Sequence, residues 1–162
     1  MLESVSLTYR NAAPEDESFL FKLYTSTRTE ELDAWGWNTQ QHEAFLKMQF
    51  QAQQISYRNQ FPNSNYQIIL IQKLAVGAML VIRKEAEIHL VDLALLPEYR
   101  DQGIGTFLLQ NLLIEAAQTR KPVRLQVIQV NRAFQLYQRL GFSTVGNNGI
   151  HFAMEWLPPN IA

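Results

Sequence analysis

The segment from Arg100 to Thr106 (RDQGIGT) constrains this chain more than any other part of its sequence. It follows an apolar, strand-like run from Leu90 to Leu96 and precedes an apolar, helix-like run from Phe107 to Ala117. A glycine-rich turn between a strand and a helix leaves the N–H groups of the helix start open to an anion. An arginine before the turn can give the same anion two parallel hydrogen bonds. On spacing alone, the segment is therefore either a pyrophosphate site or an ordinary turn.

Two well-known phosphate-binding turns do not fit this segment. A dinucleotide fingerprint needs a third glycine, and Leu108 occupies that position after Gly103 and Gly105. A P-loop needs a lysine after its glycines, and no lysine follows here. The segment has to be interpreted together with the rest of the chain.

Apolar periodicity predicts the order strand, two helices, three strands, helix, strand, helix and two strands. The expected strands cover residues 5–10, 66–72, 76–83, 87–96, 123–130, 142–145 and 150–157. The first expected helix begins at Pro14. The other three cover residues 39–58, 103–119 and 131–141. The apolar positions in helical phase on the second helix are Phe45, Met48, Ala52 and Ile55. We expect a turn from Gly146 to Gly149 between the last two strands.

Length and composition exclude several classes of protein. A chain of 162 residues suits one domain, and we expect residues 1–162 to form one. The net charge is −1 with no long run of either sign, so nothing indicates a nucleic acid or an anionic membrane as partner. No apolar run approaches the ~20 residues that span a bilayer, and the N-terminus lacks a signal-peptide core. Without cysteine there is no disulfide framework and no cysteine nucleophile. We expect a cytoplasmic protein.

A second motif, from Asn131 to Phe142 (NRAFQLYQRLGF), follows the expected strand 123–130. Together the two motifs resemble the GNAT superfamily of acyl-CoA-dependent N-acetyltransferases. Arg100, Gly103 and Gly105 match the family's Arg/Gln-x-x-Gly-x-Gly/Ala signature for acyl-CoA. The second motif matches the family's pattern of Asn, then Leu-Tyr, then Leu-Gly-Phe. The order of the expected elements also agrees with the family.

The resemblance implies a single-domain α/β (α+β) fold with a mixed, mostly antiparallel sheet flanked by helices. In such a fold the strands 87–96 and 123–130 splay apart, and the pantetheine arm of acetyl-CoA pairs with the backbone between them. We expect the pairing groups in Leu93, Ala94 and Leu95. The other residues expected to bind acetyl-CoA are Arg100, Gln102, Gly103, Ile104, Gly105, Thr106 and Asn131. The alternative for Arg100 is a solvated loop arginine. Similar enzymes need no metal.

Two residues are candidates for proton transfer. By the resemblance, Tyr137 is the general acid that protonates the leaving thiolate, since a phenol with a pKa of about 10 stays protonated at neutral pH. The alternative is a core residue, because Tyr137 shares a helix face with other apolar side chains. Asp92 lies in an apolar strand, on the same face as Leu90 and Ala94. It is either the general base or, as the residues favour, a structural carboxylate bound to a neighbour.

The acceptor pocket is expected between the first two helices, the segment that covers the substrate side in the family. Its notable residues are Arg28, Glu30, Glu31, Trp35 and Trp37. The acids could bind a cationic amine and the tryptophans could stack on it. The alternative is a solvated run of charges with two packing tryptophans.

The expected function is transfer of an acetyl group from acetyl-CoA to a primary amine of a small molecule or peptide, by direct attack in a ternary complex. One alternative keeps the fold with a different acyl donor or a hydroxyl acceptor. Another is a non-catalytic acyl-CoA-binding or regulatory module, and a protein-interaction domain would leave the glycine turn unexplained. The apolar last strand, ending at Trp156 and Leu157, could support a homodimer.

Overall fold

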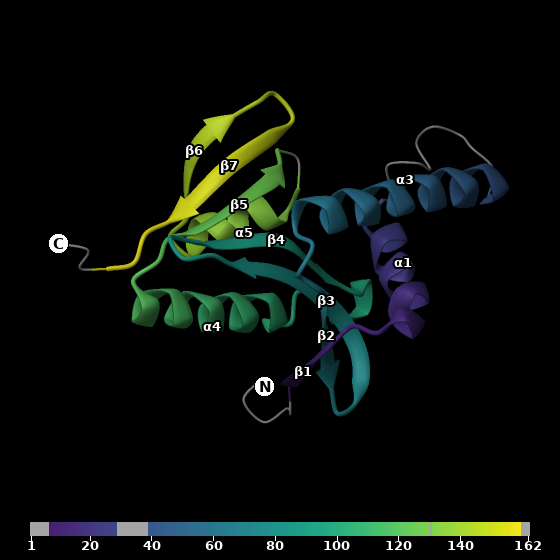
Figure 1. The fold of residues 1–162 in the computed structure, drawn as a ribbon, viewed down its shortest axis with the longest axis horizontal. Helices are drawn as coiled ribbons and strands as arrows, with labels where there is room; N and C mark the ends of the chain where they lie inside the picture. The colour runs from purple at the N-terminus through teal and green to yellow at the C-terminus, as the bar shows by residue number, and fades with distance from the viewer. Residues whose placement is uncertain (1–6, 29–38, 130, 160–162) are drawn as a thin grey trace. The chain divides into compact units, whose positions relative to one another are not determined.

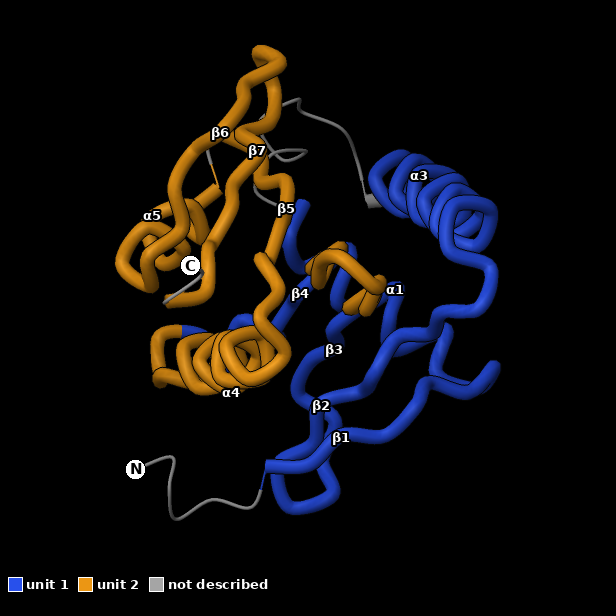
Figure 2. The backbone as a smooth tube through the Cα atoms, turned by 60° about the vertical axis from the view of Figure 1, so that its left-hand side comes forward, with its two compact units in different colours: residues 1, 3–80, 92–100 blue, residues 2, 81–91, 101–162 orange. Residues whose placement is uncertain are grey.

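The computed structural model describes residues 7–28, 39–129 and 131–159. The chain forms two compact units (Figure 2). The first comprises the residues up to 80 together with 92–100, and the second comprises 81–91 together with the residues from 101 on. Two strands, β3 (Leu74–Arg83) and β4 (Ile88–Leu95), run from one unit into the other.

The expected order of elements is confirmed within the described ranges (Figure 1). The other strands are β1 (Leu7–Asn11), β2 (Gln67–Ile71), β5 (Val123–Ile128), β6 (Ser143–Asn147) and β7 (His151–Trp156). The α-helices are α1 (Glu17–Ser26), α3 (Thr39–Gln60), α4 (Ile104–Thr119) and α5 (Ala133–Arg139). Two single 3₁₀ turns, η2 (Pro14–Asp16) and η3 (Pro97–Tyr99), precede α1 and follow β4.

The strands form a mixed sheet in the order β1-β2-β3-β4-β5-β7-β6. The β1–β2, β2–β3, β5–β7 and β6–β7 pairs are antiparallel, and the β4–β5 pair is parallel. The parallel ladder joins only Ile88–Leu90 to Val123–Leu125, whereas β5 pairs with β7 along its whole length. The expected mixed, mostly antiparallel sheet is confirmed, and the short parallel ladder is what a splayed pair requires.

In the first unit, α1 packs on α3 through aromatic rings. The Phe50 ring centroid lies 5.4 Å from that of Phe21 and 5.6 Å from that of Tyr24. The Tyr24 hydroxyl also donates a hydrogen bond to the side chain of Gln49 at 3.3 Å. The start of α1 is as expected, because Pro14 opens η2 and Asp16 accepts a hydrogen bond from the Ala13 N–H at 2.7 Å.

The expected apolar face of α3 is wrong. Met48 is 61% exposed and Ile55 is 51% exposed, while Leu46 and Phe50 are buried. The expected face was Phe45, Met48, Ala52 and Ile55. Apolar residues occur on both sides of this helix, so periodicity alone is ambiguous. The aromatic residues of α1 decide which side is covered, because they pack against Phe50.

Gly77 allows β3 and β4 to approach closely in the first unit. A Cβ atom at Gly77 would lie 2.5 Å from the Ala94 carbonyl oxygen and 2.7 Å from the Leu95 side chain. Any other residue would push away the end of β4 that precedes the glycine turn. The absence of a side chain at Gly77 therefore sets the position of this part of β4.

In the second unit, α4 buries Leu108, Leu109, Leu112 and Ala116, each at most 4% exposed. The expected turn from Gly146 to Gly149 is partly wrong, since Gly146 and Asn147 belong to β6. The side chains of Asn147 and Asn148 accept hydrogen bonds from the backbone N–H groups of residues 149–151. The turn therefore lies at residues 148–150, between β6 and β7. β7 is paired on both sides, by β5 and β6, so it is not an edge strand.

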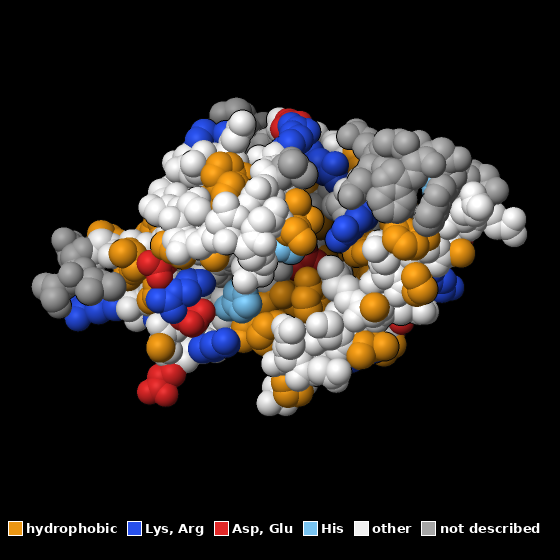
Figure 3. Space-filling view, turned by 90° about the horizontal axis from the view of Figure 1, so that it is seen from above, with side chains coloured by type: hydrophobic (Ala, Val, Ile, Leu, Met, Phe, Trp, Pro, Cys, Tyr) orange, Lys and Arg blue, Asp and Glu red, His pale blue; other side chains and the backbone are white. Residues whose placement is uncertain are grey.

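Charged side chains of both signs are interspersed on the face seen in Figure 3. In the second unit, for example, Arg124 bridges Glu87 at 3.0 Å and Glu155 at 2.8 Å. Within the described ranges, no helix combines the length and the apolar character needed to cross a membrane.

Candidate functional site

The glycine turn of the second unit opens α4 as expected. Gly103 has φ 84°, in the left-handed region that favours glycine, and it directly precedes the first residue of α4. The first helical hydrogen bond runs from the Phe107 N–H to the Gly103 carbonyl at 3.0 Å. The N–H groups of the first helical turn therefore lie at the positive end of a 16-residue helix. This geometry suits an anion.

Arg132 adds a cation to this turn, and the sequence analysis missed it. Its guanidinium lies 2.9 Å and 3.1 Å from the carboxylate oxygens of Asp101. Both side chains are exposed, so the pair adds little stability. It does offset the negative charge of Asp101 beside a turn that suits an anion. No local pattern indicates this pairing, because the two residues lie on different elements.

Asn131 caps α5. Its side-chain oxygen accepts a hydrogen bond from the Ala133 N–H at 2.8 Å, as expected for an asparagine at a helix start. A role in binding acetyl-CoA stays a prediction.

Tyr137 lies on α5 and is 8% exposed. Its ring centroid is 5.5 Å from that of Phe142, and its carbonyl accepts a hydrogen bond from the Phe142 N–H at 3.0 Å. Gly141, with φ 101°, lets the chain turn back so that Phe142 reaches the ring. These contacts fix the ring in place, which both the core interpretation and the catalytic interpretation require.

Arg100 belongs to the first unit and is not a solvated loop arginine. Its Nε donates to the Leu95 carbonyl at 3.0 Å and one terminal nitrogen donates to the Ser26 hydroxyl at 3.2 Å. The partly buried side chain thereby ties the end of β4 to the end of α1. Binding of a pyrophosphate by Arg100 stays a prediction.

The backbone of Leu93 to Leu95 is partly engaged. The Leu93 N–H donates a hydrogen bond to the Asp92 carboxylate, and the Leu95 carbonyl accepts from Arg100. The Ala94 carbonyl faces Gly77. Pairing with a pantetheine arm would therefore use the remaining groups of this segment.

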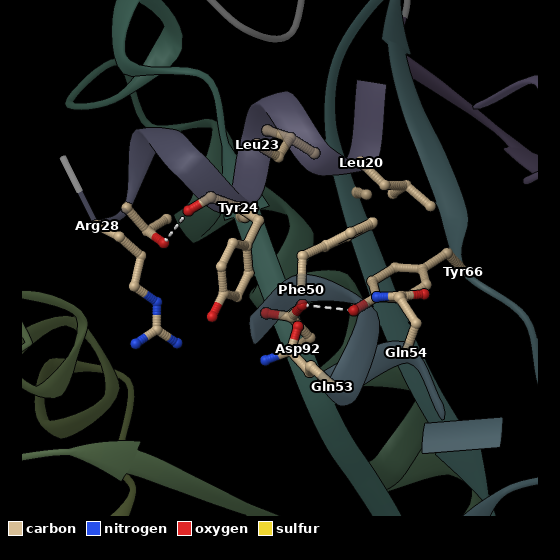
Figure 4. A pocket seen from close by; sticks show the side chains of 12 residues that line it. Leu20, Leu23, Tyr24, Arg28, Phe50, Gln53, Gln54, Tyr66 and Asp92 are labelled. Atoms are coloured by element: carbon tan, nitrogen blue, oxygen red, sulfur yellow. Dashed lines mark hydrogen bonds between the residues drawn. The ribbon is translucent and has the colours of Figure 1, made fainter. Parts of the chain in front are cut away.

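A cavity of about 70 Å³ opens in the first unit among α1, α3 and β4 (Figure 4). Asp92 and Ala94 both line it, so the expected strand face of Asp92 is confirmed. The cavity is also lined by Tyr24, Arg28, Phe50, Gln54 and Tyr66. Of these, only Arg28 was expected at a substrate site. Glu30, Glu31, Trp35 and Trp37 lie outside the described residues.

Asp92 is the acid of this cavity. Its carboxylate accepts a hydrogen bond from the Tyr66 hydroxyl at 2.7 Å (Figure 4). Burial raises the pKa of Asp92, while the hydrogen bonds from Tyr66 and Leu93 and the charge of Arg28 oppose the rise. Asp92 is partly buried and has a partner, as expected for an aspartate in an apolar strand. A carboxylate with a raised pKa in a cavity can also accept a proton.

Arg28 is the cation of the cavity. Its guanidinium lies 4.8 Å from the centre of the Tyr24 ring, and its buried Nε has no hydrogen-bond partner in the described structure. An unpaired buried donor costs about 1–3 kcal/mol. Burial raises the pKa of Tyr57 on α3 to about 12, the charge of Asp92 adds to the rise, and Arg28 opposes it. Arg28 therefore influences both Asp92 and Tyr57.

Tyr66 is the functional candidate that sequence reasoning missed. It is 7% exposed and directly precedes β2, where it looks like an ordinary strand residue. Asp92 lies 26 residues further along the chain, so the sequence around Tyr66 does not indicate their contact. Only the pairing of the strands brings the phenol to the carboxylate.

The family model for an acetyltransferase (GNAT) domain matches residues 30–158. A comparison with curated protein sequences returned no match.

Solved structures share the fold. PaiA N-acetyltransferase from Thermoplasma acidophilum, in complex with coenzyme A, superposes with a TM-score of 0.67 at 21% identity, covering 94% of this chain and 99% of that one. Ard1 from Thermoplasma volcanium superposes with a TM-score of 0.65 at 18% identity, covering 95% and 99%. An acetyltransferase of the GNAT family from Streptococcus pneumoniae gives 0.57 at 21% identity, covering 94% and 99%. At these identities the likeness shows the fold alone.

Proposed function

The chain belongs to the GNAT acetyltransferase family, and on that premise we propose that it transfers an acetyl group from acetyl-CoA to a primary amine of a small molecule or peptide. The observation that supports the proposal most is the environment of the Asp92 carboxylate. Its carboxylate lines a cavity, has a raised pKa and is held by Tyr66. Transfer to an amine needs a group that accepts the proton of the attacking nitrogen, and Asp92 has the chemistry for it.

For the donor, we propose that the N–H groups from Gln102 to Thr106 bind the pyrophosphate of acetyl-CoA. The helix start and the φ of Gly103 suit this role. Arg100 is proposed as a further partner of the phosphates, and the backbone of Leu93 to Leu95 as the partner of the pantetheine arm. The structural neighbour from Thermoplasma acidophilum, solved with coenzyme A, supports a coenzyme A donor.

For the chemistry, we propose direct attack of the amine on the thioester. The amine nitrogen forms a bond to the carbonyl carbon, and the carbon–sulfur bond breaks. Asp92 accepts the proton that the nitrogen loses, directly or through a water. Tyr137 donates a proton to the departing sulfur. The chain has no cysteine, so a cysteine-bound acyl enzyme is not available to it.

The test is release of free thiol from acetyl-CoA across a panel of polyamines, aminoglycosides, amino acids and peptide N-termini. We expect at least one amine to release thiol and to gain one acetyl group by mass spectrometry. Binding of acetyl-CoA with no thiol release across the panel would instead support a non-catalytic acyl-CoA-binding module. Release with alcohols but not with amines would support a hydroxyl acceptor.

A further inference from the structure

Two opposite charges line the cavity of the first unit without pairing with each other. Asp92 lies on β4, and Arg28 lies just after the end of α1. Asp92 is held by Tyr66 and by the Leu93 N–H. No nitrogen of Arg28 lies within 4.0 Å of an acidic oxygen among the residues that the structure describes. The cavity thus offers separate sites to a cation and to an anion (Figure 4).

Arg28 differs from the other arginines of the described structure. The arginines that pair with a carboxylate are Arg10, Arg83, Arg124 and Arg132. Arg100 donates to a carbonyl and a hydroxyl. The arginines that are exposed to water are Arg58, Arg120 and Arg139. Arg28 is partly buried, its Nε is unpartnered, and its guanidinium rests on the Tyr24 ring.

This arrangement is suited to an oxyanion. A ring contact holds a guanidinium in a fixed plane and leaves its edge free for two parallel hydrogen bonds to a carboxylate. A second ammonium group near Arg28 would be repelled, so a polyamine fits the cavity poorly.

We propose that the acceptor is an amino carboxylate, in which the amine meets Asp92 and the carboxylate is bound by Arg28. Arg28 is then a specificity-determining residue. This inference rests on the proposed function and adds the chemical class of the acceptor to it.

The experiment compares acceptors that differ only in the carboxylate. The panel contains the common α-amino acids and straight-chain β-, γ- and ε-amino acids, each beside its own carboxamide, with spermidine as a polycation. We expect at least one amino acid to exceed its carboxamide by about tenfold or more in kcat/KM for thiol release. A carboxamide has the less basic amine, so basicity alone favours the opposite order. Carboxamides or spermidine acting as well as or better than every amino acid would overturn the proposal.

Arg28→Gln tests the residue. We expect the KM of the preferred amino acid to rise about tenfold or more with kcat nearly unchanged, and the preference over the carboxamide to disappear. Arg28→Lys keeps the positive charge but lacks the two parallel N–H donors of the guanidinium, so it should recover part of the preference for the amino acid over its carboxamide. The matched control is Arg58→Gln, at the exposed end of α3, which should behave like the unsubstituted protein. A preference that survives in Arg28→Gln would overturn the proposal.

Calorimetric titration separates this inference from the proposed function. With coenzyme A present, we expect the amino acids to bind and the carboxamides to bind more weakly, and Arg28→Gln to abolish the difference. If no amine releases thiol but this binding pattern holds, the proposed transfer is wrong and the anion site stands. If amines release thiol but the carboxylate has no effect on binding, the transfer stands and the inference is wrong. Circular dichroism melts of each variant confirm folding.

Discussion

At the scale of single residues, Asp92 has the chemistry that depends most on its surroundings. On its own, an aspartate in an apolar strand is better explained by a structural role than by a catalytic one. The structure supplies both a partner, Tyr66, and a cavity. The two roles make different predictions, because only a base links the protonation of Asp92 to the rate.

We expect Asp92→Asn to lower kcat/KM by about 10²–10⁴, the usual contribution of a general base. The base must be ionised, so the rate should rise with pH through the pKa of Asp92. Burial raises that pKa, so the acid limb should lie above the range of an ordinary aspartate. Initial rates from about pH 4 to 9 measure this, and the limb should vanish in Asp92→Asn. If the acid limb of the pH–rate profile is unchanged in Asp92→Asn, the limb reports the titration of another group.

Tyr66→Phe is the companion change. The hydroxyl hydrogen bond lowers the pKa of Asp92, so its removal should raise that pKa and move the acid limb to higher pH. A purely structural Asp92 would leave the limb in place and change only the stability, which a thermal melt detects.

Tyr137 gives a separate prediction. Tyr137→Phe should lower kcat by about 10²–10⁴ and leave the dissociation constant of acetyl-CoA nearly unchanged. The phenylalanine ring can keep the contact with Phe142, so stability should change little. Steady-state kinetics and calorimetry measure the two quantities. Unchanged turnover would remove Tyr137 from the mechanism and leave it as a core residue.

At the scale of elements, the start of α4 separates a structural glycine from a ligand-binding one. Among the described residues, a Cβ atom at Gly105 would meet only the Leu136 side chain, at an ordinary 3.6 Å. Alanine is also favoured over glycine inside a helix by about 0.5–1 kcal/mol. Nothing among the described residues therefore requires a small residue at this position, whereas a phosphate close to the backbone would exclude a large side chain.

We expect Gly105→Leu to weaken acetyl-CoA binding by about tenfold or more, since a large side chain would obstruct the pyrophosphate, and Gly105→Ala, which the family signature allows, to keep most of the affinity. Calorimetry measures the affinities, and thermal melts confirm that both variants fold. Gly146→Ala, whose Cβ would lie 3.4 Å from that of Ala153 in the same unit, is the control and should leave the affinity unchanged. Equal affinities for Gly105→Leu and Gly146→Ala would place the pyrophosphate elsewhere.

The helices also show the limit of local patterns. In α4 the side chains of Leu108, Leu109, Leu112 and Ala116 are buried, but the apolar side chain of Ile114 is 57% exposed. In α3 apolar residues lie on both sides, and the face that is buried is the one that meets Phe21 and Tyr24. Helical periodicity identifies a helix more reliably than it identifies the covered face.

At the scale of the whole molecule, the proposed donor should stabilise the fold by mass action. At 100 times its dissociation constant, a ligand that binds only the folded state adds about 2.7 kcal/mol. For a chain of this size we expect a rise in melting temperature of roughly 5–10 °C with acetyl-CoA. Inorganic phosphate at the same concentration should give a much smaller rise. No shift at saturating acetyl-CoA would contradict a coenzyme A donor.

The sequence is enough to predict the order of the elements, the glycine turn before α4, the asparagine at the start of α5 and the family. These features depend on residues close together in the chain, whose backbone preferences and spacing act locally. Three contacts depend on the packing of distant segments: Tyr66 bonds Asp92 across 26 residues, Arg100 bonds Ser26 across 74, and Arg28 lines the cavity with Asp92. Such contacts arise from strand register and helix packing, which bring distant residues together and leave no mark on the residues beside them.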